Sequence, residues 1–215
     1  IKLATPWGLV MILAGMQLLL LSSQSWLGRP SPALCELRNW FFFGGSVMIF
    51  SALCAKSARI TYIIYKADRL KSVSIRTWKV MVLSTLLCVP IVILLALNSG
   101  LSPSHDVRSL SSDHSRVDVF CIHDYSTYIY ACFGYFGLLL LASLYFALRN
   151  RNVPTGFNET RHIFIAEYVV AAVVVIGSVV SVTTKKSAPL ISILFSVIPM
   201  FFGVTVLWIV FFGPK

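Results

Sequence analysis

Apolar residues fill this chain in six long stretches that are separated by shorter polar connections. Each stretch has roughly the 17 to 25 residues that a helix needs to cross a bilayer. A helix on the surface of a water-soluble protein keeps a polar stripe along one side. The pattern predicts an all-α fold, a polytopic bundle of transmembrane helices, with spans at approximately 4–25, 37–62, 78–98, 126–148, 163–183 and 189–211.

The second stretch, Cys35–Leu70, is the clearest of the six. It begins with a cysteine beside charged residues, continues through about two dozen mainly apolar residues and ends in a basic cluster. We interpret it as a membrane helix with a possible disulfide anchor at one end and a cationic, partner-facing end at the other.

Composition supports a membrane protein. The chain is 57% hydrophobic and 12% charged, and its mean hydropathy is +0.82. A soluble domain of 215 residues would need more polar surface, so most side chains must face lipid or other apolar helices. The net charge of +10 does not indicate a nucleic-acid partner, because the basic residues lie between apolar stretches and not in one patch.

The basic residues predict the orientation. Twelve of the 18 Lys and Arg residues fall in one alternate set of connections, and the longest connection of the other set, 99–125, is rich in Ser and Asp. By the positive-inside tendency the first set is cytoplasmic, so the N-terminus of this chain and its C-terminus are both predicted to be cytoplasmic. No secretory signal precedes the first span, which starts almost directly after Lys2.

Two of the five cysteines, Cys35 and Cys121, fall on the predicted outer side, where conditions are oxidising. A disulfide between them would attach the outer loop to the second span, and the alternative is that both remain thiols. Within the apolar spans a thiol behaves as a small hydrophobic group. That description applies to Cys54, Cys88 and Cys132.

Ionisable residues near the predicted inner side are candidate switch elements. Lys56 and Glu159 belong to inner ends of spans at comparable depth, so an ion pair between them could hold a closed state. Glu167 lies near a span as well. It is open whether this acid has a functional role or pairs at the membrane interface.

The sequence lacks the common motifs of enzymes, cofactor sites and metal sites. No HExxH, GxSxG or P-loop sequence occurs, so no enzyme and no cofactor is predicted. The outer-loop histidines have no compact metal-ligand spacing, so no metal site is predicted. We expect the aromatic run 40–43 to face lipid or to anchor the helix at the membrane interface, and we expect small residues at Gly44-Gly45 and Gly134-xx-Gly137 to allow close helix approach.

Four short motifs in register resemble a known family. They are Cys35-x-x-Arg38-x-Trp40, Ala55-Lys56-x-x-Arg59-Ile60, Arg151-Asn-Val-Pro154-x-x-Phe157-Asn158-Glu159 and Pro214-Lys215. Over nearly the whole chain their order and spacing resemble the seven-helix domain of class C (family 3) G-protein-coupled receptors, the group of metabotropic glutamate and GABA-B receptors. One inner loop is similar to the glutamate branch and the other is more GABA-B-like.

The resemblance implies a helix assignment, specific residue contacts and partners that the residues alone do not give. The six spans would be helices two to seven of a plasma-membrane receptor, with the first helix and an extracellular domain that binds a small-molecule ligand both outside this chain. It implies a Cys35–Cys121 disulfide, an inner ionic contact of Lys56 with Glu159, a receptor dimer and coupling to a heterotrimeric G protein through inner loops 66–79 and 149–161. The G-protein-facing residues would be Arg59, Lys66, Arg69, Lys71, Arg76, Arg151, Phe157 and Asn158.

A small-solute transporter or channel is the alternative. Such a protein would show internal repeats and several polar groups near the membrane midplane. Pro90 and Pro199 do interrupt spans, but proline kinks are ordinary in membrane helices, and no convincing repeat relates 1–100 to 126–215. The sequence therefore favours a signalling receptor.

Overall fold

The structure is a computed structural model. It describes residues 6–27, 31–67, 77–101, 105–110, 117–122 and 127–149, together with Tyr168, Ile198, 201–206, Trp208 and Ile209. Four helices and one pair of strands make up the longer described segments. In chain order they are α1 (Pro6–Leu27), α2 (Pro32–Ala67), α3 (Thr77–Leu101), β1 (His105–Leu110), β2 (Val117–Ile122) and α4 (Thr127–Arg149).

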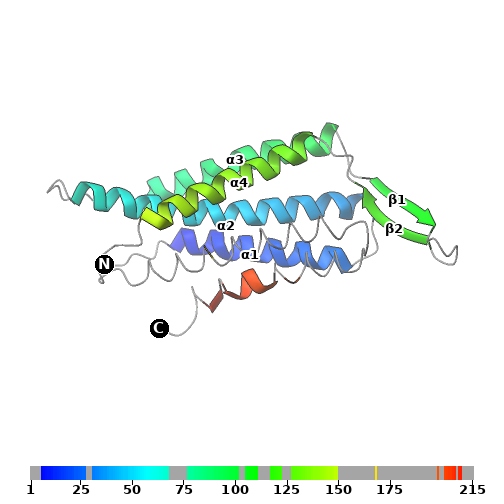
Figure 1. The fold of residues 1–215 in the computed structure, drawn as a ribbon, viewed down its shortest axis with the longest axis horizontal. Helices are drawn as coiled ribbons and strands as arrows, with labels where there is room; N and C mark the ends of the chain where they lie inside the picture. Colours follow the sequence, from blue (N-terminus) through cyan, green and yellow to red (C-terminus); the bar gives the residue numbers. More distant parts are fainter. Residues whose placement is uncertain are drawn as a thin grey trace.

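Helix α2 lies at the centre of the described bundle (Figure 1). It packs against α1, α3 and α4, and α3 also packs against α4. Successive helices run in opposite directions, so each end of the bundle collects alternate helix termini. We call the end with the strands, the last turns of α1 and α3 and the first turns of α2 and α4 the hairpin end, and the opposite end the basic end.

The predicted fold class is confirmed. Within the described ranges, four helices are long and apolar enough to cross a membrane by length and composition: Trp7–Ser25, Pro32–Ile63, Trp78–Leu101 and Thr127–Phe146. They coincide with the first four predicted spans. The spans predicted at 163–183 and 189–211 lie almost wholly outside the described residues, and they stay predictions.

Helix α2 is longer at both ends than its predicted span, 37–62. Ser31 precedes it and accepts a hydrogen bond from the Leu34 backbone N–H through its side chain at 3.3 Å, while Pro32 occupies the first turn. A serine cap followed by proline is a frequent start of a helix. With 36 residues, α2 is about 54 Å long, which exceeds the roughly 30 Å of a bilayer's hydrocarbon core.

The connection expected as a loop at 99–125 contains an antiparallel hairpin. Strands β1 and β2 pair in a register that places His105 opposite Ile122 and Asp106 opposite Cys121. Strand β1 also lies against α2. The sequence 117–122, VDVFCI, alternates polar and apolar residues in part and is rich in β-branched residues, which is the local pattern that favours a strand.

Aromatic rings join α2 to α4. Phe43 meets Phe133 with ring centroids 4.9 Å apart, and Phe50 meets Phe136 at 5.5 Å, both edge to face. Phe43 is only 2% exposed. The expectation that the aromatic run 40–43 faces lipid or anchors the helix at the interface is therefore wrong for Phe43, because its ring is buried against α4.

Helices α1 and α2 approach most closely at two glycines. A Cβ built on Gly45 would lie 2.8 Å from the carbonyl oxygen of Gly15, and one built on Gly15 would lie 2.8 Å from that of Gly45. Small residues at such crossings allow two backbones to touch. The prediction of a close approach is thus right for Gly45, whereas added Cβ atoms at Gly44, Gly134 and Gly137 would meet no atom within 4 Å.

Candidate functional site

The predicted site residues follow α2 from one end of the bundle to the other. Cys35 is buried at the hairpin end, and Lys56 and Arg59 are half-buried toward the basic end. Lys66 lies inside α2, one residue before its end, and not in a loop. The other predicted inner residues lie outside the described part of the chain: Arg69, Lys71, Arg76, Arg151, Phe157, Asn158, Glu159 and also Glu167.

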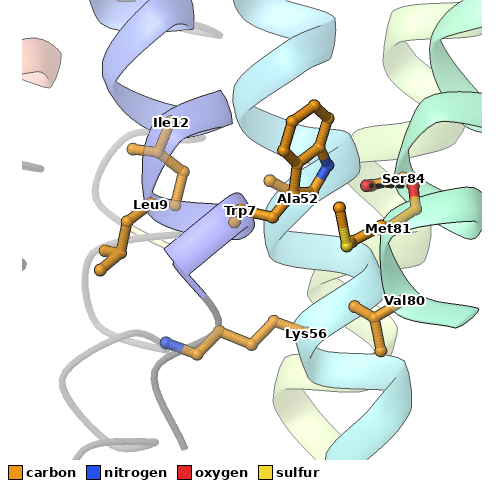
Figure 2. A pocket seen from close by; sticks show the side chains of 9 residues that line it. Trp7, Leu9, Ile12, Ala52, Lys56, Val80, Met81 and Ser84 are labelled. Carbon is orange, nitrogen blue, oxygen red and sulfur yellow. Dashed lines mark hydrogen bonds between the residues drawn. The ribbon is translucent and has the colours of Figure 1, made fainter. Parts of the chain in front are cut away.

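A small cavity surrounds the base of Lys56 between α1, α2 and α3 (Figure 2). Trp7 reaches from α1 toward Ala52 of α2, and the Lys56 side chain extends beneath the first turn of α1. The volume of about 20 Å³ is enough for about one water molecule. The lining is otherwise mostly apolar: Trp7, Gly8, Leu9, Ile12, Ala52, Val80, Met81 and Ser84.

A polar network links α2 to α3 at the hairpin end. Trp40 donates from Nε1 to Ser99 Oγ at 2.9 Å. The Ser99 hydroxyl in turn lies within hydrogen-bond distance of Glu36 Oε1 and, at 2.9 Å, of the Leu95 carbonyl. Because a serine hydroxyl carries one hydrogen, it donates to one of these two acceptors at a time.

Arg38 ties the start of α2 to the end of α1. Its side chain is 8% exposed, and Nη2 donates to the carbonyl oxygen of Ser25 at 2.9 Å. Ser22 Oγ donates to the Arg38 carbonyl at 3.4 Å. The last carbonyls of a helix lack partners within the helix and carry partial negative charge, so a cation here satisfies one of them and offsets the dipole of α1.

The cysteines differ in chemical state. Cys35 is fully buried and disulfide-bonded, whereas Cys54, Cys88 and Cys132 are thiols within the helices. Cys121 lies in β2, of which the structure describes the backbone pairing. A buried disulfide at the first turn of α2 fixes this end of the helix to another part of the chain.

Helix α3 contains Pro90, which has no N–H to donate and disturbs the hydrogen bonds of the preceding turn. The Tyr135 hydroxyl of α4 donates to the carbonyl oxygen of Leu87 in that turn at 2.5 Å. At the next residue of α3, Cys88 Sγ lies 3.2 Å from Ser51 Oγ of α2. Side chains from both neighbouring helices thus contact α3 near its proline, as expected for a proline inside a membrane helix.

The two ends of the bundle differ in charge. The structure describes three acidic residues, Glu36, Asp106 and Asp118, and all three belong to the hairpin end, together with two basic residues. The described helix termini at the basic end carry only positive charge. Their basic residues are Lys56, Arg59, Lys66, Lys79 and Arg149.

Sequence reasoning missed the partners of Arg38 and Ser99. Both residues were visible, but the contacts join helices that are separated by a connection, 13 residues apart for Arg38 and Ser25 and 59 for Trp40 and Ser99. The only available signal was that polar residues inside apolar spans usually face another helix. That signal predicts burial and does not identify the partner.

The comparison with protein families identifies the class. Residues 1–215 match the family described as "7 transmembrane sweet-taste receptor of 3 GCPR". The chain therefore belongs to the class C G-protein-coupled receptors, and the predicted resemblance is confirmed. It is a membrane receptor domain of a family that is not an enzyme family.

Proposed function

We propose that this domain passes an extracellular ligand signal to a heterotrimeric G protein, and that the basic end of the bundle is the cytoplasmic, G-protein-facing end. The charge difference between the ends supports this proposal. Every described acidic residue lies at the hairpin end, and five basic residues mark the other. Positive charge at the ends of membrane helices favours the cytoplasmic side.

The proposed switch is an ion pair between Lys56 and Glu159. Lys56 lies where α1, α2 and α3 meet, beside a cavity with room for about one water molecule, so its surroundings change when these helices move. In the resting state the pair favours a closed arrangement of the basic end. The G protein binds the open arrangement better, through Arg59, Lys66 and the basic loops, and so shifts the population toward it.

The proposal also includes a ligand, a second receptor and lipids as partners. An extracellular small-molecule ligand binds outside residues 1–215, and a second receptor forms a homo- or heterodimer with this one in the plasma membrane. Lipids surround the apolar helix faces. The hairpin, which contacts α2 through β1, lies on the extracellular side and transmits the ligand's effect to α2.

Nucleotide exchange tests coupling directly. The receptor that contains this chain is reconstituted in proteoliposomes with purified heterotrimeric G proteins, and ligand-dependent nucleotide uptake by the G protein is measured. Solute flux is measured in the same vesicles. Exchange without flux supports the receptor, while flux without exchange by any G-protein class would support the transporter.

We further propose that Cys35 pairs with Cys121. The other three cysteines are thiols, and a bond to β2 would fix the hairpin to the buried start of α2. Replacing either cysteine by serine is expected to lower the free energy of unfolding by about 2–5 kcal/mol, as for native disulfides elsewhere. Thermal unfolding in detergent measures the loss.

The matched control for the disulfide is Cys88→Ser, which alters a thiol in α3 and is expected to change stability much less. Peptide mapping without reduction gives the connectivity itself. Alkylation of Cys121 in the folded, unreduced protein would contradict the pairing.

A further inference from the structure

We propose that the exposed face of the α3–α4 pair at the basic end binds the headgroup of an acidic phospholipid through Lys79, Tyr145 and Arg149. All three side chains are exposed in the bundle. Arg149 Nη1 donates to the Tyr145 hydroxyl at 3.0 Å, so the guanidinium lies beside the tyrosine hydroxyl.

The helix geometry places these residues on one face of the α3–α4 pair. Tyr135 of α4 touches Leu87 of α3, which identifies the facing sides of the two helices. Arg149 is 14 residues after Tyr135, close to four helical turns, so it lies on nearly the same side of α4. Lys79 precedes Leu87 by eight residues, on the i, i+4 row that runs along α3 beside α4.

Lys79 and Tyr145 also lie at similar positions along the axes of the two helices. Along its helix, Lys79 is about 12 Å from the level of the Tyr135–Leu87 contact, and Tyr145 is about 15 Å from it in the same direction. Because the helices are antiparallel neighbours (Figure 1), both positions lie toward the basic end. The backbone of Arg149 is about 21 Å from that level, and its guanidinium reaches back to the Tyr145 hydroxyl. Lys79 and the Tyr145–Arg149 pair therefore lie at similar heights on the exposed α3–α4 face.

The surface beyond these residues suits acyl chains. On α3 the exposed residues Leu83 and Leu86 continue the row of Lys79, and on α4 Leu141 and Leu138 continue the row of Tyr145. Leu86 and Leu141 are 63% and 62% exposed. Basic side chains beside a continuous apolar surface match a lipid, which carries charge and hydrocarbon in one molecule, better than they match a soluble anion.

Charge complementarity selects an acidic lipid. The described helix termini at this end carry no acidic residue that would repel a phosphate or neutralise Lys79 and Arg149. Basic residues beside a membrane attract anionic headgroups, and an amphipathic tyrosine is a common residue at this depth. Zwitterionic phosphatidylcholine lacks the net negative charge that this pair of cations would bind.

Native mass spectrometry of the purified receptor tests the site. The protein is released from micelles that contain phosphatidylcholine and an equal amount of phosphatidylserine, and the retained lipid is identified. Wild type is expected to retain phosphatidylserine preferentially. The double variant Lys79→Gln/Arg149→Gln is expected to bind it about 30-fold more weakly, because each basic residue near an acidic membrane surface contributes about fivefold.

Two controls separate the explanations. The double variant Lys79→Arg/Arg149→Lys keeps the charge and should keep the lipid, and Arg108→Gln removes a charge at the hairpin end and should change nothing. Equal retention by wild type and Lys79→Gln/Arg149→Gln, or an equal loss in Arg108→Gln, would overturn the proposal. Competition by glycerophosphoserine at the lipid's own concentration would instead assign this face to soluble anions and would overturn the proposal of a lipid site.

Discussion

Replacing Gly45 by alanine is expected to destabilise the bundle by about 1–3 kcal/mol, the usual cost of overpacking a filled contact. The new methyl group would lie 2.8 Å from the Gly15 carbonyl oxygen and 3.1 Å from the Leu19 backbone nitrogen. Both atoms belong to the backbone of α1, so the whole helix must move. A valine at the same position is expected to prevent the two helices from packing.

Thermal unfolding with a thiol-reactive dye measures this effect, because Cys54 and Cys132 are buried thiols that react when the bundle opens. The matched control is the adjacent Gly44→Ala, whose methyl group would meet no atom within 4 Å. That change is expected to be neutral, or to stabilise by about 0.5–1 kcal/mol through helix propensity. Equal melting temperatures for Gly45→Ala and Gly44→Ala would show that the α1–α2 crossing tolerates separation of the two helices.

Replacing Lys56 or Glu159 by alanine is expected to raise basal G-protein nucleotide exchange by about fivefold. An ion pair near a protein surface contributes up to about 1 kcal/mol, and losing that amount from the closed state shifts a two-state equilibrium by that factor. The measurement is ligand-free nucleotide exchange at matched surface expression.

The charge-reversed double variant Lys56→Glu/Glu159→Lys is the sharper control for the ion pair. It restores attraction with the signs exchanged, and we expect basal exchange to return most of the way to the wild-type rate. If each single variant behaves as wild type, the Lys56–Glu159 pair does not control the switch. Additive effects with no rescue would mean that the residues act separately.

Hydrophobic patterning predicts the helices of this protein well, since a bilayer leaves few alternatives for a long apolar segment. It located α1, α2, α3 and α4 within a few residues, except that α2 extends five residues beyond its predicted span at each end. Those extra turns are polar enough to resemble connections. At the start of α2, Ser31 caps the extra turn. At the other end, the helix continues past the apolar region through Lys66 to Ala67.

The rotation of each helix about its axis could not be predicted in the same way. Gly44 and Gly45 are adjacent and chemically identical, yet only Gly45 touches α1. Trp40 forms a hydrogen bond with Ser99, although an interfacial position facing lipid was expected. Since nearly every face of these helices is apolar, the sequence carries little information on which side meets a neighbour, and close packing decides it.

The length of α2 has a mechanical consequence. One continuous helix of about 54 Å contains both the disulfide-bonded Cys35 and Lys66, and its Gly45 contact with α1 lies about a third of the way from Cys35 to Lys66. If α2 pivots at the glycine crossing, a tilt of 5° moves its end at Ala67, about 33 Å away, sideways by about 3 Å, and moves Cys35, about 15 Å away on the other side, by about 1 Å. A displacement at the basic end would therefore require less than half of that displacement at the hairpin end.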